Sequence, residues 1–142
     1  MKKTLLTLLT ATMLMTGITT TLSASQGTKS SKPFLIQGKL PHLTMMVKIL
    51  WDDEDLALSK EQKTKLLKIR QHTMGTAKAL NLQIVKLENE VVKRSKQGMK
   101  PSSLKTLVED IAALRLEATM VHLECIYNTR AILSEDQLYV LE

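Results

Sequence analysis

Two copies of one five-residue pattern, Leu-Ser-x-x-Gln, decide the fold of this chain: Leu58-Ser59-Lys60-Glu61-Gln62 and Leu133-Ser134-Glu135-Asp136-Gln137. In each copy the serine hydroxyl is expected to accept a hydrogen bond from the backbone N–H three residues later, while the glutamine side chain accepts one from the serine N–H. Such a capping box starts an α-helix and stabilises it by roughly 1 kcal/mol. We therefore predict that one helix begins after Ser59 and another after Ser134.

The sequence between the two copies predicts two long helices that pair with each other. The first is expected from Lys60 to about Arg94, on the order of 35 residues or ~50 Å. In both helices apolar residues recur at alternating steps of three and four, the spacing of a left-handed helix pair. An all-α fold follows, an elongated antiparallel helical hairpin with short terminal helices. The expected seam residues are Ala77, Leu80, Ile84, Leu87 and Val91 in the first helix and Leu104, Leu107, Ile111, Leu114, Ala118, Val121 and Cys125 in the second.

Glycine, proline and serine residues indicate where this hairpin turns and where its helices start or are interrupted. The stretch Ser95–Pro101 contains Gly98 and predicts the turn, after which Ser102 or Ser103 is expected to cap the return helix. Gly75 interrupts the first helix, where glycine costs roughly 1 kcal/mol relative to alanine, and favours a bend or a close approach of another segment.

A second apolar stripe lies on another face of the return helix. Its members are Leu116, Met120, Leu123 and Tyr127. One apolar face is enough to pair with the preceding helix, so the stripe must be covered by the terminal helices, a second subunit or a client protein. A single hairpin of this size buries little surface, which favours a homodimer.

The beginning of the chain divides into three parts. Residues 1–24 have a basic start, an uncharged run and small residues before the expected cleavage site, as a secretory signal peptide does; retention as a membrane anchor is the alternative. Residues 25–39 are rich in polar residues and predict a flexible linker. Residues 40–142 are expected to form the helical domain, beginning with a short amphipathic helix over about Pro41–Leu50. After cleavage we expect no stable membrane span.

Composition excludes several classes of function. Lysine and arginine exceed the acidic residues by six, but both signs alternate along the helices and the chain has only one Trp, one Phe and two Tyr, so a nucleic-acid surface is not expected. No glycine-rich phosphate loop, carboxylate pair or activated nucleophile is apparent, which indicates that the protein is not an enzyme. Cys125 is the only cysteine and is expected to be a small core residue, or to form an intermolecular disulfide.

The two motifs resemble the signature of the Spy/CpxP family of periplasmic stress proteins, a repeated Leu-Thr-x-x-Gln, with serine in place of threonine in both copies. The resemblance covers roughly residues 41–142. It implies a periplasmic protein of a Gram-negative bacterium, a curved dimer that holds unfolded or misfolded proteins without ATP or damps the periplasmic domain of a sensor kinase. The expected client-binding residues are then the stripe itself, rimmed by Lys and Arg residues of the preceding helix.

Periplasmic heavy-metal sensors are related to this family, so a metal-binding function is the alternative. His42 and Met46 stand one turn apart on the first helix, and His122 stands one turn before Cys125 on the return helix. If the first helix packs across the hairpin, His42, Met46 and His122 converge on one ion. Zn, Ni, Co or Cu would be the cofactor. His72 is out of register with this set.

Overall fold

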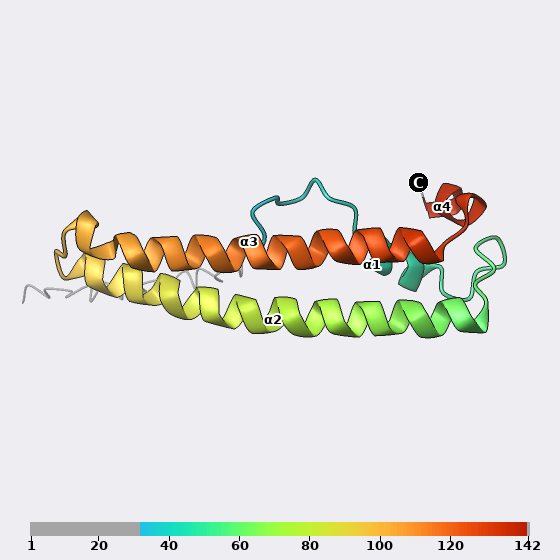
Figure 1. The fold of residues 1–142 in the computed structure, drawn as a ribbon, viewed down its shortest axis with the longest axis horizontal. Helices are drawn as coiled ribbons and strands as arrows, with labels where there is room; N and C mark the ends of the chain where they lie inside the picture. The colour runs from blue at the N-terminus through green and yellow to red at the C-terminus, as the bar shows by residue number, and fades with distance from the viewer. Residues whose placement is uncertain (1–31, 142) are drawn as a thin grey trace, which may run out of the picture.

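Four α-helices follow one another in the part of the chain that the structure, a computed structural model, describes: residues 32–141. They are α1 (Leu43–Ile49), α2 (Lys60–Lys96), α3 (Pro101–Ile132) and α4 (Glu135–Leu141) (Figure 1). The described residues contain no β-strand, and the all-α prediction is confirmed. The predicted signal peptide and the first part of the predicted linker lie outside the described residues.

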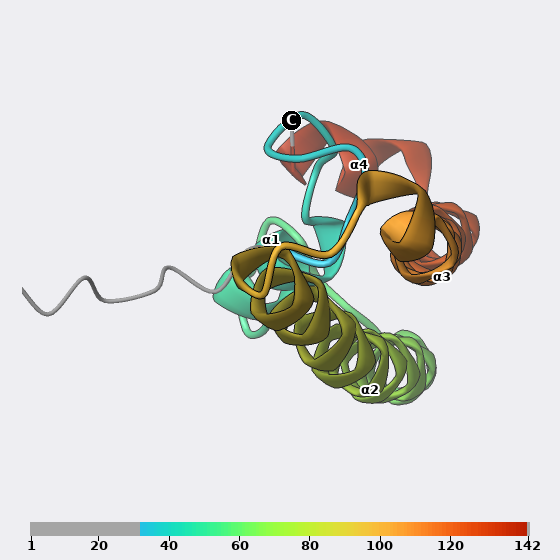
Figure 2. The same ribbon diagram turned by 90° about the vertical axis from the view of Figure 1, so that its left-hand side faces the viewer.

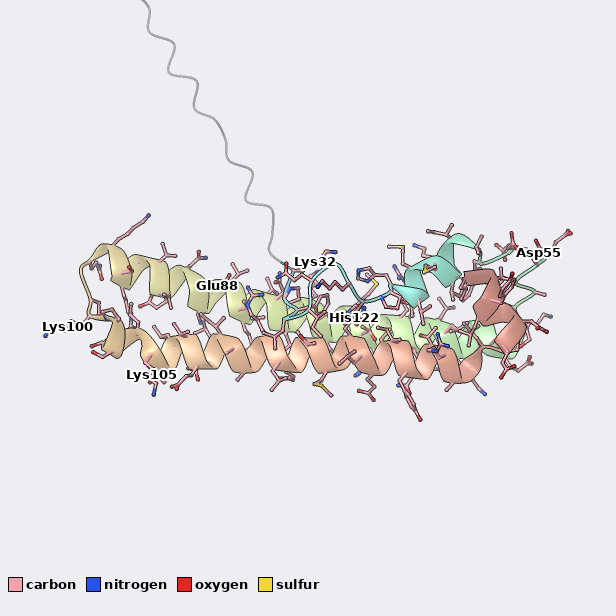
Figure 3. All side chains as sticks on the ribbon, turned by 90° about the horizontal axis from the view of Figure 1, so that it is seen from above. Lys32, Asp55, Glu88, Lys100, Lys105 and His122 are labelled. Carbon is pink, nitrogen blue, oxygen red and sulfur yellow. The ribbon has the colours of Figure 1, made fainter. Side chains whose placement is uncertain are left out.

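The two long helices run side by side in opposite directions and confirm the predicted hairpin (Figures 1 and 3). Their facing residues follow the predicted seam. Leu80 and Ile84 of α2 are buried, as are Leu104, Ala118 and Cys125 of α3. Burial of each leucine or isoleucine side chain contributes roughly 1.5–3 kcal/mol, and this burial is the main force that holds the pair together.

Two local predictions need correction. The turn does contain Gly98 in the left-handed region, at φ 78°, but α3 begins at Pro101 and its N-cap is Lys100, which makes no side-chain capping bond. Neither Ser102 nor Ser103 is therefore the cap, because proline at the first helical position already has the φ that a helix needs. A Cβ on Gly75 would meet nothing within 4 Å, so no close approach explains this glycine. The first short helix, expected over about Pro41–Leu50, is confirmed at Leu43–Ile49.

The core of the molecule lies at the end of the hairpin where the two motifs stand. Here α1 and α4 pack beside the long helices, and Figure 2 shows both on the same side of the α2–α3 pair. Six buried residues from α1, α2, α4 and the connecting segments form a cluster, against which the partly buried Ile126 and Ile132 of α3 pack: Leu43, Val47, Leu56, Leu66, Leu133 and Leu141. Leu56 is completely buried even though it belongs to the acidic connection between α1 and α2.

The segment before α1 lies along α3 (Figure 1). The Leu35 N–H donates a hydrogen bond of 2.8 Å to the Thr119 hydroxyl, and Arg115 donates one of 3.0 Å to the Lys32 carbonyl. Residues 32–39 belong to the stretch for which composition predicts a flexible linker, yet they make specific contacts with the hairpin. Among residues 32–141 no helix has the length and apolarity that crossing a membrane requires.

Candidate functional site

The two capping motifs meet in space. Both form complete capping boxes: the serine hydroxyls of Ser59 and Ser134 accept from the backbone N–H groups of Gln62 and Gln137 at 3.1 and 3.2 Å. In return, the Oε1 atoms of the two glutamines each accept from a serine N–H at 3.0 Å. The predicted helix starts are therefore confirmed.

The glutamine amides then bind each other, an arrangement we call the glutamine clasp (the side chains of Gln62 and Gln137). Gln62 Nε2 donates to Gln137 Oε1 at 2.7 Å, and Gln137 Nε2 donates back to Gln62 Oε1 at 3.2 Å. The remaining N–H groups reach backbone carbonyls, that of Ile132 from Gln62 at 3.0 Å and that of Leu56 from Gln137 at 2.9 Å. Leu133 is buried and Leu58 half-buried beside them. The motifs thus cap two helices and also fasten the ends of the hairpin.

The predicted stripe on α3 is largely open to solvent. The exposed fractions are 54% for Leu116, 56% for Met120 and 73% for Tyr127, while Leu123 is half-buried. Successive helical residues are about 100° apart around the axis, so the four share one face. On α3 the exposed neighbours at one edge of this face are Glu117 and Glu124, which makes that edge acidic. The lysine rim expected from the preceding helix stays a prediction.

The structure brings His42 and His122 together across α1 and α3. Their rings stack, with centroids 5.0 Å apart and planes inclined by 19°, and Phe34 contacts the His122 ring at 4.8 Å. The two imidazoles line a cavity of about 400 Å³ that Met45, Met74 and Cys125 also line. Met46 instead packs against the core cluster. The convergence of the histidines was predicted only on the condition that the first helix packs across the hairpin. The choice between two adjacent methionines was not predictable, because a rotation of α1 by one residue exchanges them.

Burial controls the chemistry of this cavity. His122 is buried and its Nδ1 has no hydrogen-bond partner. Desolvation, followed by the electrostatic effects of His42 and Lys32, lowers the pKa of His122 below its ordinary value, which favours the neutral imidazole, the form that binds a metal ion. The Cys125 thiol is buried and lies 3.9 Å from the Thr44 hydroxyl, which places it in the core. Within residues 32–141 no three His, Cys, Asp or Glu side chains are grouped closely enough to hold a metal ion.

Comparisons of the chain with protein-family models, with curated proteins and with solved structures found no match. The resemblance to the Spy/CpxP family therefore depends on the two motifs and the hairpin between them.

Proposed function

We propose that this protein is an exported, ATP-independent holding chaperone of the periplasm, which binds unfolded or misfolded polypeptide on the stripe Leu116, Met120, Leu123 and Tyr127. The observation that carries the proposal is the exposure of Leu116, Met120 and Tyr127 on a helix whose opposite face is already used for pairing with α2. A regular helix face can accept many sequences, since apolar contact is not directional.

The resemblance to the stress-protein family supports the same function. It adds a homodimer and, as another partner, the periplasmic domain of a sensor kinase. Glu117 and Glu124 at the edge of the stripe favour clients with basic residues beside their apolar segments, because opposite charge accelerates encounter.

The test is suppression of aggregation of a chemically reduced or heat-labile model client by the mature chain. Met120→Glu combined with Tyr127→Glu puts two charges on the stripe, and both positions are exposed enough to leave the hairpin intact. A buried apolar side chain contributes roughly 1.5–3 kcal/mol to binding, so the amount of protein needed for protection should rise about tenfold or more.

The matched control is Val108→Glu combined with Leu82→Glu, which adds the same charge at similarly exposed apolar positions outside the stripe. Circular dichroism checks that both variants fold. Equal protection by the stripe variant and by the unchanged protein would overturn the assignment of the binding face.

A second candidate function is metal binding in the cavity of His42 and His122. The unpartnered Nδ1 of His122, together with the thiol of Cys125 and the thioethers of Met45 and Met74, fits a soft ion such as Cu(I) better than Ni or Co. The stacked imidazoles present their faces to each other, so at least one ring must turn before both nitrogens can bind one ion.

Titration of the mature chain with Cu(I) and with Zn²⁺, against a competing chelator, tests this second function. Stoichiometric binding should be lost in His122→Ala and retained in His72→Ala, since His72 is exposed and does not line this cavity. Met45→Leu should weaken binding, whereas Met46→Leu should not. If neither metal binds and a chelator does not change client protection, the metal-binding function is excluded and the chaperone function remains.

A further inference from the structure

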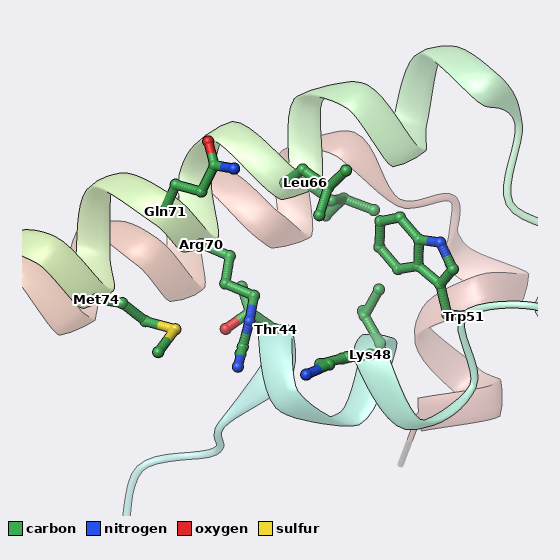
Figure 4. A pocket seen from close by; sticks show the side chains of 9 residues that line it. Thr44, Lys48, Trp51, Leu66, Arg70, Gln71 and Met74 are labelled. Carbon is green, nitrogen blue, oxygen red and sulfur yellow. The ribbon is translucent and has the colours of Figure 1, made fainter.

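A cavity of about 440 Å³ opens between α1 and α2 on the flank of the hairpin (Figure 4). Its floor is apolar: Val47 and Leu66 are buried, and the half-buried indole of Trp51 stands beside Leu66. This volume lies in the range of about 300–1,000 Å³ that is usual for small-molecule sites. The cavity contains no residue of the client-binding stripe and neither of the paired histidines, although Thr44, Arg70 and Met74 also line the neighbouring histidine cavity.

Two cations stand at the opening of this cavity. Figure 4 shows the side chains of Lys48, from α1, and Arg70, from α2, directed toward the same region of the cavity. Within residues 32–141 neither of them forms an ion pair. Two like charges beside an apolar wall repel each other, and an anion placed between them would remove that repulsion.

The acidic residues closest in sequence do not supply this anion. Asp52, at the start of the acidic connection, pairs with Lys63 at 2.8 Å, and neither residue lines the cavity. The Lys63 ammonium lies 5.7 Å from the centroid of the indole ring. The Asp53 carboxylate accepts hydrogen bonds from the backbone N–H groups of Asp55 and Leu56. Lys48 and Arg70 are thus left to an external anion.

We propose that this cavity binds a single-chain anionic amphiphile, with its alkyl chain against Val47, Trp51 and Leu66 and its anionic head between Lys48 and Arg70. A fatty carboxylate is the simplest ligand with this chemistry, and a monoalkyl phosphate shares it. The apolar floor requires a chain and the paired cations require a charge, so neither an inorganic anion nor a neutral alcohol meets both conditions.

The protein carries its own probe for this site, because Trp51 is its only tryptophan. Titration of the mature chain with dodecanoate, below the concentration at which it forms micelles, should give a saturable change in Trp51 emission. Dodecan-1-ol should bind at least about tenfold more weakly, a difference of about 1.4 kcal/mol. Dodecyl phosphate distinguishes a carboxylate site from a general anion site, and inorganic phosphate alone should leave the emission unchanged.

Substitution of the two cations tests the role of charge. Lys48→Gln combined with Arg70→Gln should lower the affinity for dodecanoate at least about tenfold while leaving that for dodecan-1-ol nearly unchanged. Lys65→Gln combined with Lys68→Gln removes the same charge from positions of α2 that do not line the cavity, and should bind as the unchanged protein does.

Three results would each overturn the proposal. They are the absence of a saturable emission change, equal affinity for the alcohol and the carboxylate, and equal loss of binding in the two double variants. Since the stripe on α3 is not touched by any of these substitutions, client protection should be unaffected, and failure of the chaperone proposal would leave this one intact.

Discussion

At the scale of single residues, the glutamine clasp explains why both motifs end in glutamine. A capping box accepts glutamate or glutamine equally at this position, because only an acceptor oxygen is used. The clasp also uses donors: the side-chain NH₂ of Gln62 donates to the Ile132 carbonyl and to Gln137 Oε1. A carboxylate has no N–H group, so glutamate can form the cap but not the clasp.

Gln62→Glu therefore separates the two roles. We expect the capping box of α2 to survive, while the free energy of unfolding falls by about 1–3 kcal/mol because the Ile132 carbonyl and Gln137 Oε1 each lose the hydrogen bond that Gln62 donates and meet a negative charge. Urea unfolding followed by circular dichroism measures the change. Gln83→Glu, at an exposed position of the same helix, is the control and should have little effect. Equal stability of the two variants would mean that the clasp contributes nothing.

His122 gives the protein a pH-dependent stability. Its pKa in the folded protein is lowered, first by burial and then by His42 and Lys32, from the ordinary histidine value of 6.5. As the pH falls, the unfolded chain takes up this proton before the folded chain does, so the free energy of unfolding decreases from about pH 6.5 downward. Above that range the contribution is constant.

His122→Phe keeps a ring between Phe34 and His42 but cannot titrate. The loss of stability between about pH 7.5 and about pH 5.5 should be smaller in this variant than in the unchanged protein. His72→Gln, which removes an exposed histidine, should retain the full loss. Urea unfolding curves at the two pH values measure this loss. An unchanged pH dependence of stability in His122→Phe would show that His122 does not cause it.

Sequence reasoning at the residue scale succeeded where the cause is local. The capping boxes were predictable because serine and glutamine three residues apart reach each other within one turn. The clasp was not, since it joins side chains 75 residues apart and depends on the hairpin placing both motifs at one end. A signal was nevertheless present, namely glutamine in both copies where glutamate would cap as well. The cavity beside Trp51 left no such signal, because its wall combines faces of two helices.

At the scale of elements, the hairpin was predictable from the three-four stepping of its seams, since that pattern fixes which face of each helix is buried. The start of α3 was predicted at the wrong residues because serine is the better cap in isolation. Pro101 is only compatible with the first turn of a helix, and its fixed φ decides the start.

Gly75 offers a direct test of helix propensity. It is exposed inside the 37-residue helix α2, and a Cβ at this position has open space around it. Gly75→Ala should raise the free energy of unfolding by about 0.5–1 kcal/mol, because alanine loses less backbone entropy on folding. Thermal unfolding of the variant and of the unchanged protein measures this difference in stability. A destabilised variant would show that α2 needs the flexibility of glycine, for example to open the cavity beside Trp51.

At the scale of the whole molecule, the long helices make the protein elongated. The 37 residues of α2 extend about 55 Å at 1.5 Å per residue. A compact domain of about this chain length has a radius of gyration near 13 Å. Small-angle X-ray scattering of the mature chain should therefore give a clearly larger value.

The same scattering experiment gives the molecular mass and tests the proposed homodimer. We expect twice the mass of the mature chain. If the partner covers the stripe on α3, Tyr127→Glu should convert the dimer to a monomer; if the stripe is free for clients, the mass should not change. A monomeric mass for the unchanged protein would contradict the dimer, and with it this part of the family resemblance.

The clasp and the core cluster also decide what a cut in the chain would do. The turn at residues 97–100 is exposed, as sites of proteolytic nicking are, and it lies at the end of the molecule opposite to the clasp. Gln62 and Leu66 belong to the half before the turn, whereas Gln137, Leu133 and Leu141 belong to the half after it. The nicked protein should consequently stay together as two complementary fragments, and the halves produced separately should reassemble into one particle.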